Sequence, residues 1–307
     1  MDFMASDAAK PSGAEAPVDA DDCPLCGGTR AHHLFTKKGY ELVRCDGCDL
    51  VRISPMPTAA ELQKIYSFEA GYHQNFADDE SERQKRRRAA ENQLRFAQEY
   101  SRRGRLLDVG ASAGFFIGAA AEAGWGAEGD ELSADTAAEA RARTGLKVHT
   151  GQLTDLDLPE ASYDLITMWD VIEHLLDPLE AAHRVRELLK PDGRFILETP
   201  NEGGLFPRVS YAASKVADFW PHPEPPHHVV QFSVKTITDL LDRAGFEVET
   251  LVTRGIPVGY SLSGLTKEHF KLSPFTLYCA AMAPFALAGP KIGMGDTMRI
   301  VARPREV

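Results

Sequence analysis

Four of the five cysteines occur in two C-x₂-C pairs, and this spacing is the first feature that points to chemistry. Cys23 and Cys26 lie in "CPLCGG", whereas Cys45 and Cys48 lie in "CDGCDL". The eighteen residues between the pairs match the C-x₂-C-x₁₅₋₂₀-C-x₂-C pattern of zinc sites. Two such turns surround one metal ion with four thiolates and leave no position for water. The sequence therefore predicts a structural Zn²⁺ site.

Two other interpretations of the cysteine pairs have less support. A disulfide pairing is disfavoured because the N-terminal stretch carries no secretion signal. Iron–sulfur ligation is disfavoured by Gly27 and Gly47, which stand where metal knuckles need permissive backbone, and by the hairpin spacing between the pairs. We interpret His32 and His33 as hairpin surface, and Cys279 as a separate buried thiol.

The stretch "DVGASAG", residues 108–114, admits two chemistries. It contains the G-x-S-x-G pattern of a nucleophile elbow, which would make Ser112 a nucleophile. With its flanks it is an apolar strand, an acidic residue and a small-residue turn that opens a helix, as in nucleotide-binding folds. The hydrolase interpretation is disfavoured because the strands that precede an elbow in that fold have no counterpart here. The dinucleotide pattern also fails, because Gly110 and Gly114 are four residues apart.

A nucleoside-like ligand without phosphates fits this turn better. The turn contains no Lys or Arg, and its small residues let backbone N–H groups approach a ligand. Glu131 follows Asp108 by 23 residues, at the end of the second predicted strand. An acidic residue at that place accepts the ribose hydroxyls in nucleoside-binding α/β folds. We therefore assign Glu131 to ribose binding.

The elements that must position these residues alternate along the chain from residue 104. The predicted strands lie near residues 105–109, 126–131, 146–149, 163–168, 193–199, 246–253 and 297–303. The predicted helices lie near residues 114–123, 133–143, 178–190 and 233–244. Ser133 and Ser233 are candidate N-caps, and Gly245 is a candidate C-cap. This alternation predicts an α/β fold with a doubly wound, seven-stranded, Rossmann-like sheet behind a small zinc ribbon.

Composition sets the expected domain organisation. A chain of 307 residues, 43% hydrophobic, can bury one large core and carry smaller attachments. A capping box of Thr58 and Glu61 predicts a short helix after the ribbon. The predicted segments are a disordered tail (1–22), the zinc ribbon (23–57), a helical linker and cover (58–103), and a main domain (104–307) in which residues 255–292 form a lid or interface insert.

Charge and hydropathy limit the partners. The net charge of −11 argues against a large nucleic-acid footprint, although residues 81–105 hold nine Lys or Arg against three Glu. That segment is interpreted as a solvated helix face or an anion-binding patch. No uninterrupted transmembrane stretch occurs, and residues 272–290 contain three prolines. We interpret them as a buried segment, a lid, a dimer contact or a peripheral membrane contact. We expect a cytoplasmic protein, and the sequence does not determine its oligomeric state.

Several blocks together resemble class I S-adenosylmethionine-dependent methyltransferases. They are "LLDVGASAGFF", "GDELS", "GQLTDLDLP", "YDLITMWDVIEHLLDP", "LKPDGRFILETPN" and "HHVVQFS", and they cover about residues 104–254. "GDTMRIVARP" resembles the last strand of that family. With its ribbon, the chain is similar to bacterial methyltransferases that carry an N-terminal zinc-binding domain, a group that includes sugar C-methyltransferases.

The resemblance implies roles for individual residues. Asp108 would orient the loop and the methionine amino group, while Gly110, Ser112 and Gly114 would border the cofactor. Ser112 stands where the family commonly has glycine. The remaining implied positions flank adenine or line the methyl-transfer cavity; they are Gln152 and Leu153 for adenine, and Trp169, Asp170 and His174 for the cavity.

The resemblance also implies a base for the acceptor. His227 and His228 align with the glutamate–histidine pair of the sugar C-methyltransferases, with histidine in place of the glutamate. We take His228 as the first candidate for general base and His174 as the second. The alternative is that these histidines only hydrogen-bond to backbone.

The preferred function is methyl transfer to a hydroxyl or carbon of a small, sugar-like or lipid-linked acceptor. One alternative is an RNA methyltransferase that uses the ribbon and the basic helix. The other is a non-catalytic zinc-ribbon binding module with a degenerate cofactor fold.

Overall fold

The computed structural model describes residues 17–19, 21–65, 80–217, 220, 223–255 and 274–306. Much of the predicted tail, the second half of the short linker and the centre of the predicted insert lie outside these residues. The chain divides into two compact units. We call the first the ribbon unit; it comprises residues 1–56, 199–237 and 252–299. We call the second the sheet unit; it comprises residues 57–198, 238–251 and 300–307.

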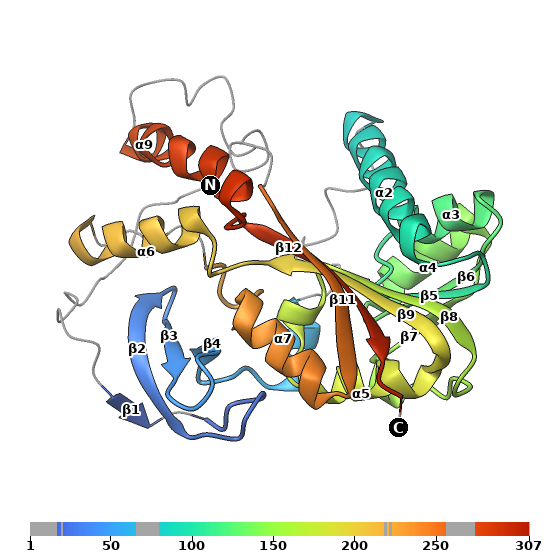
Figure 1. The fold of residues 1–307 in the computed structure, drawn as a ribbon, viewed down its shortest axis with the longest axis horizontal. Coiled ribbons are helices and arrows are strands. Elements are labelled where there is room, and N and C mark those ends of the chain that lie inside the picture. The colour runs from blue at the N-terminus through green and yellow to red at the C-terminus, as the bar shows by residue number, and fades with distance from the viewer. Residues whose placement is uncertain are drawn as a thin grey trace. The chain divides into compact units, whose positions relative to one another are not determined.

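The sheet unit is organised by a seven-stranded sheet (Figure 1). From edge to edge its strands are β11 (Phe246–Arg254), β12 (Thr297–Pro304), β9 (Leu189–Pro200), β8 (Tyr163–Trp169), β5 (Arg105–Val109), β6 (Gly126–Glu131) and β7 (Val148–Thr150). The pairs among β7, β6, β5, β8 and β9 are parallel. All seven predicted strands are confirmed, and β9 begins four residues before its predicted start.

The strand order reverses beside β5. From β5 the chain proceeds to β6 and then β7 on one side, and it then returns to form β8 and β9 on the other side. In the register, Asp108 lies opposite Gly129 of β6 and Thr167 of β8. In doubly wound sheets, ligands bind outside the carboxyl ends of the strands at such a reversal. The strand order therefore predicts a ligand site at the loops that follow β5, β6, β7 and β8.

Four helices connect these strands as the apolar periodicity predicts. They are α3 (Phe115–Glu122), α4 (Ala134–Thr144), α5 (Pro178–Leu188) and α7 (Val234–Arg243), with short 3₁₀ turns at Leu153–Asp155 and Ile172–His174. Two more helices, α1 (Ala59–Ile65) and α2 (Glu80–Tyr100), precede the first strand of this sheet. The Ser133 side chain accepts the Thr136 N–H at 3.4 Å, which confirms the predicted cap. The Ser233 side chain caps α7 in the same way, and Gly245 has a left-handed φ of 81°.

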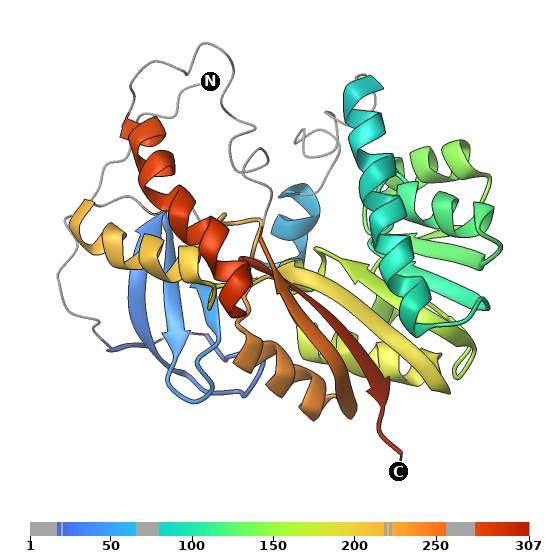
Figure 2. The ribbon, with the colours of Figure 1, turned by 45° about the horizontal axis from the view of Figure 1, so that its top comes forward.

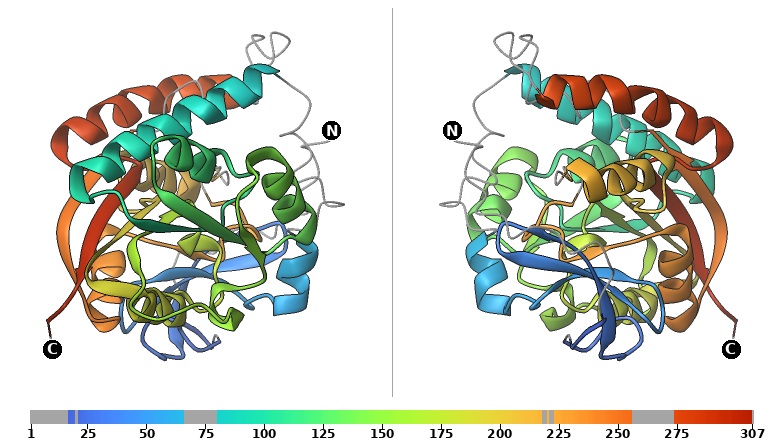
Figure 3. Two further views of the ribbon diagram at one scale, coloured as in Figure 1. Left: turned by 90° about the vertical axis from the view of Figure 1, so that its right-hand side faces the viewer. Right: turned by 90° about the vertical axis from the view of Figure 1, so that its left-hand side faces the viewer.

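The basic segment forms most of α2, which packs against α3 (Figure 3). Only Ala90, Leu94 and Ala97 of this helix are buried. Arg83 pairs with Glu80 at 2.8 Å, and Lys85 pairs with Glu82 at 2.9 Å. Short-range pairs of this kind are typical of a solvated helix face.

The ribbon unit contains a second sheet of five strands. Their order is β1 (Pro17–Asp19), β2 (Arg30–Lys37), β3 (Tyr40–Cys45), β4 (Val51–Ser54) and β10 (Val230–Gln231). The predicted hairpin is formed by β2 and β3. The strand β10 comes from a distant part of the chain and pairs with β4, with Val230 opposite Arg52. Residues 199–237 therefore add a strand to the sheet that is formed by the N-terminal strands β1 to β4.

Two helices complete the ribbon unit, and they pack against each other (Figure 2). They are α6 (Leu205–Ala217) and α9 (Pro274–Ala288), and a 3₁₀ turn (Gly289–Ile292) follows α9. Helix α9 continues through Pro284. Cys279 is only partly buried on α9, which corrects the prediction of a buried thiol. Within the described residues, no helix combines the length and the apolar character needed to cross a bilayer.

Candidate cofactor site and metal centre

The four paired cysteines converge in the ribbon unit. All four Sγ atoms lie within 4.8 Å of one another. The Cys23–Cys48 and Cys26–Cys45 Sγ separations are both 3.5 Å. Four sulfur ligands at about 2.3 Å from a tetrahedral zinc ion would be separated by about 3.8 Å, whereas a disulfide requires about 2.05 Å. The arrangement fits one Zn²⁺ ion and does not fit two disulfides.

The two knuckles have the same backbone geometry but use different residues. The Gly27 N–H donates to the Cys23 carbonyl at 2.8 Å, and the Asp49 N–H donates to the Cys45 carbonyl at 3.0 Å. Gly27 and Asp49 both have a φ of 70°. Gly47 does not occupy this left-handed region; a Cβ there would lie 3.3 Å from Cys26 Sγ. The prediction that Gly47 supplies permissive backbone is thus wrong, because this glycine provides space beside a sulfur.

The glycine loop after β5 is tied to the end of β6 by one carboxylate. Glu131 accepts the Ser112 N–H at 3.0 Å through Oε2 and the Ser133 N–H at 3.0 Å through Oε1. Ser112 has a φ of 48°, in the region that glycine adopts most readily. Within the described chain, no histidine is hydrogen-bonded to Ser112, as a nucleophile elbow would require. The loop geometry therefore supports a spacer role for Ser112.

Three acidic side chains gather where β5 and β6 end. Asp108, Asp130 and Glu131 are 3%, 4% and 7% exposed. Asp108 accepts the Thr167 hydroxyl at 2.6 Å, yet burial raises the pKa of Asp108 to about 7. Burial also raises the pKa of Glu131, against the effect of its backbone hydrogen bonds. Such a concentration of carboxyl groups is suited to a ligand that brings hydroxyl donors and positive charge.

The remaining predicted residues of the sheet unit follow the neighbouring strands. Gln152 and Leu153 begin the 3₁₀ turn after β7, and Leu153 is 5% exposed. Trp169 ends β8, and its ring lies 5.3 Å from that of Phe116 on α3. Asp170 has a φ of 54°. Because parallel strands place their carboxyl ends at one edge, the topology gathers these residues around the loop of Asp108.

The predicted histidines lie in different units. His174 ends the 3₁₀ turn after β8 in the sheet unit. His227 and His228 precede β10 in the ribbon unit. The His228 N–H donates to the Glu224 carbonyl at 3.1 Å, which holds this loop in a closed turn. The catalytic roles of the three histidines stay predictions.

Comparison with known proteins identifies the fold. A family model described as a methyltransferase domain matches residues 81–251, which is more than half of the chain. The chain belongs to the class I S-adenosylmethionine-dependent methyltransferases. This enzyme family was also indicated by the resemblance of the sequence blocks, and that prediction is confirmed.

Each curated relative matches only part of this chain. A probable S-adenosylmethionine-dependent methyltransferase of Mycolicibacterium smegmatis is 30% identical over 53% of this chain and 59% of its own length. A ubiquinone biosynthesis O-methyltransferase of Haemophilus ducreyi is 33% identical over 32% of this chain and 45% of its own length. The chain thus spans about half the length of these curated relatives.

Solved structures agree on the fold of the methyltransferase. Magnesium protoporphyrin IX methyltransferase of Synechocystis aligns with a TM-score of 0.54 at 14% identity, over 81% of this chain and all of the other. A protein of Pyrococcus horikoshii aligns with a TM-score of 0.52 at 17% identity, over 78% and 99% of the two chains. At these identities the likeness concerns the fold alone.

Sequence reasoning missed Asp130, the most unusual residue near the methyltransferase loop. Its side chain is buried in β6, and Oδ1 has no hydrogen-bond partner among the described residues. Burial raises the pKa of Asp130 well above its usual range, and repulsion from Glu131 and Asp108 raises it further. The available signal was the acidic sequence of β6, GAEGDE, in a strand that the alternation places inside a parallel sheet, where both faces are covered.

Replacing Asp130 with Asn is expected to stabilise the methyltransferase increasingly as the pH rises. A carboxyl with a raised pKa in the folded state stabilises the fold below its unfolded pKa of about 4, and this contribution is lost as the pH rises through the folded pKa. Above the folded pKa, the free energy of unfolding is lower by about 1.4 kcal/mol for every pH unit that separates the folded pKa from the unfolded one. Melting temperatures between about pH 5 and pH 8 test this, with Asp192→Asn, an exposed site, as control. A pH slope that Asp130→Asn leaves unchanged would show that Asp130 does not titrate there.

Proposed function

We propose that this chain transfers the methyl group of S-adenosylmethionine to a hydroxyl or carbon of a small, sugar-like or lipid-linked acceptor. The observation that carries the proposal is the buried Glu131 carboxylate, which holds the Ser112 loop at the reversal point of the sheet. The O-methyltransferase names among the relatives favour a hydroxyl as the accepting group.

The proposed cofactor contacts follow from the donor set. Each carboxylate oxygen of Glu131 has a second lone pair, so it can accept a ribose hydroxyl while it keeps its backbone hydrogen bond. Asp108, which lies beside the loop, would hold the cationic amino group of the methionine part. Gly110 and Gly114 would border the cofactor; a Cβ on Gly110 would lie 2.6 Å from a Val171 methyl group.

The other proposed contacts extend the site across the ends of the neighbouring strands. Gln152 and Leu153 would flank adenine, and Trp169, Asp170 and His174 would line the cavity for methyl transfer. In the ribbon unit, Cys23, Cys26, Cys45 and Cys48 would hold a structural Zn²⁺ ion.

The proposed chemistry requires alignment and, for a hydroxyl acceptor, removal of one proton. Bound S-adenosylmethionine supplies a methyl group made electrophilic by its sulfonium. The imidazole of His228 would take the hydroxyl proton as the oxygen attacks, with His174 or His227 as the other candidates. The cofactor residues of the sheet unit would fix the direction of attack and exclude water.

Calorimetric titration with S-adenosylmethionine and S-adenosylhomocysteine tests the proposal first. We expect one binding site, and about one zinc per chain by metal analysis. A folded, zinc-loaded protein that binds neither compound would contradict the proposal and would favour the non-catalytic binding module.

The acceptor base is tested by His228→Ala once acceptor screening gives turnover. We expect the affinity for S-adenosylmethionine to stay unchanged and turnover to fall by roughly 10²–10⁴-fold, because a positioned base contributes that much. His183→Ala, at an exposed site on α5, is the matched control and should keep full turnover. Full turnover of the His228 variant would remove His228 from the catalytic role and direct the same test to His174.

A further inference from the structure

A cavity of about 200 Å³ lies within the ribbon unit, and the proposed methyl transfer assigns no role to its lining residues. Its lining consists of Arg44, Glu202, Pro207, Arg208, Tyr211 and Trp220. Pockets for drug-sized ligands run from about 300 to 1,000 Å³. This volume therefore fits a ligand of about one ring with its substituents.

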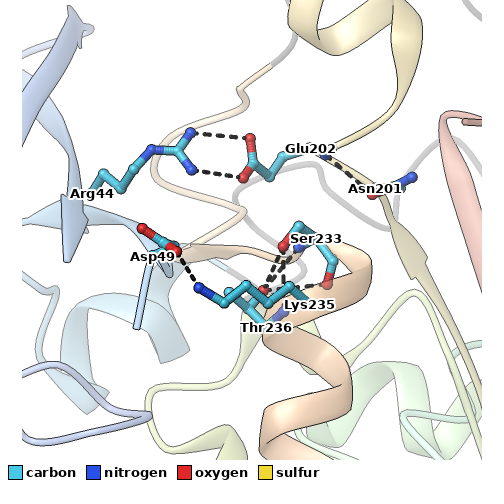
Figure 4. Close-up of polar contacts among 8 residues, drawn as sticks. Arg44, Asp49, Asn201, Glu202, Ser233, Lys235 and Thr236 are labelled. Carbon is cyan, nitrogen blue, oxygen red and sulfur yellow. Dashed lines mark hydrogen bonds and ion pairs between the residues drawn. The ribbon is translucent and has the colours of Figure 1, made fainter. Parts of the chain in front are cut away.

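The wall between β3 and α6 is built by an ion pair. The Arg44 guanidinium faces the Glu202 carboxylate, with nitrogen–oxygen distances of 3.3 and 3.4 Å (Figure 4). The Glu202 turn is held by its own N–H, which donates to the Phe232 carbonyl at 2.8 Å, and by the buried Asn201, whose amide donates to the Gly295 carbonyl at 2.8 Å. Glu202 is thus fixed, and its negative charge is matched by Arg44.

Arg208 adds a second positive charge to the cavity. It lies in the first turn of α6 and its side chain is exposed. Among the described residues, its guanidinium makes no hydrogen bond or ion pair. With Glu202 occupied by Arg44, the lining carries one uncompensated positive charge. A guanidinium in this state is suited to a carboxylate or phosphate group.

Trp220 forms an aromatic wall of the cavity, and its indole N–H is a hydrogen-bond donor without an acceptor among the described residues. Its ring lies 4.8 Å from that of Tyr211 and meets the Phe35 ring edge-on at 5.8 Å. Trp220 is 7% exposed, and its buried Nε1 has no acceptor among the described residues. Lys37 Nζ donates to the Trp220 carbonyl at 3.0 Å, which fixes this segment. A buried indole N–H normally has an acceptor, and the described residues supply none to Trp220.

We propose that this cavity binds a ring-sized organic anion, that is, a carboxylate or phosphate ester carried on a sugar or aromatic ring. Two donors of the lining have no partner among the described residues, namely the Trp220 N–H and the Arg208 guanidinium, whereas the Arg44 guanidinium is engaged with Glu202. An acceptor-rich anion satisfies these donors, and its ring packs against the faces of Tyr211 and Trp220. The site requires no methyl transfer, so its test is independent of the proposed function.

The probes are glucose 6-phosphate, glucuronate and benzoate, titrated without S-adenosylmethionine at constant ionic strength. Glucose and inorganic phosphate serve as single-group controls. The three tryptophans give three indole N–H signals in ¹H–¹⁵N spectra, and Trp220→Phe assigns the one that belongs to Trp220. We expect at least one ring anion to shift that signal saturably and to bind at least tenfold more tightly than either control. Tighter binding of glucose 6-phosphate would indicate a phosphate ester as the ligand, whereas tighter binding of glucuronate or benzoate would indicate a carboxylate.

Charge and aromatic contributions are separated by variants. Arg208→Gln and Trp220→Phe should each weaken binding at least tenfold, while Arg30→Gln, at an exposed site on β2, should not. Zinc content and melting temperature verify that each variant folds. The proposal is overturned if no ring anion moves the Trp220 signal at millimolar concentration, or if binding survives Arg208→Gln and Trp220→Phe unchanged.

Discussion

Replacing Glu131 with Gln is expected to lower the affinity for S-adenosylmethionine by about 100-fold or more. The carboxylate receives two backbone N–H groups and, in the proposed complex, the ribose hydroxyls. A glutamine has one acceptor oxygen, so its NH₂ group would face one of the two backbone donors. Each lost hydrogen bond to a charged group is worth about 1.5–3 kcal/mol, and two such losses exceed a factor of about 100.

Calorimetric titration of the variant with S-adenosylhomocysteine measures this effect. Glu122→Gln, an exposed change at the end of α3, is the matched control and should bind like the parent chain. Because Glu131 also joins two loops, we further expect faster hydrogen exchange at the Ser112 and Ser133 amides. Affinity within threefold of the parent would exclude Glu131 from the cofactor site.

Replacing Cys45 with Ser is expected to abolish stoichiometric zinc and to unfold the ribbon unit. A structural zinc site contributes apparent binding energies of about 10–16 kcal/mol at neutral pH, more than the stability of most small domains. Cys45 ends β3, and β3 belongs to the same five-stranded sheet as β10. Loss of the metal should therefore melt residues 199–237 together with the N-terminal strands.

Metal analysis and thermal unfolding with and without a chelator test this expectation. Cys279→Ser is the control, because this fifth cysteine lies on α9 and is not a member of the cluster. It should keep about one zinc per chain and its chelator sensitivity. A Cys45→Ser protein with unchanged zinc content and melting temperature would show that the four thiols serve no metal.

Local patterns were enough to predict most of the sheet unit. Strands β5 and β8 are largely apolar segments between turn residues, and capping residues such as Ser133 start helices, so a few neighbouring positions indicate each element. The cysteine spacing likewise indicated the cluster of four thiols, because a C-x₂-C turn is a local structure.

The parts that sequence reasoning missed depend on distant contacts. Strand β10 has two residues, too few for any periodicity, and it exists because β4 offers a free edge. Helix α6 has a proline at its third position, and its packing partner α9 lies some 60 residues away in the chain. The cavity at Trp220 is lined by a residue of β3 and by residues of α6 and of the segments before and after α6, which are distant from β3 in the sequence.

The sequence by itself determined the order of strands and helices in the sheet unit, the pairing of the four cysteines into two C-x₂-C turns and the acidic residues at the strand ends, because each depends on residues close together in the chain. Only the tertiary structure decided that Glu131 holds the Ser112 loop, that Asp130 is buried without a partner for Oδ1 among the described residues, and that residues 199–237 complete the ribbon sheet. These properties depend on burial and on pairing between distant segments, which the one-dimensional pattern does not contain.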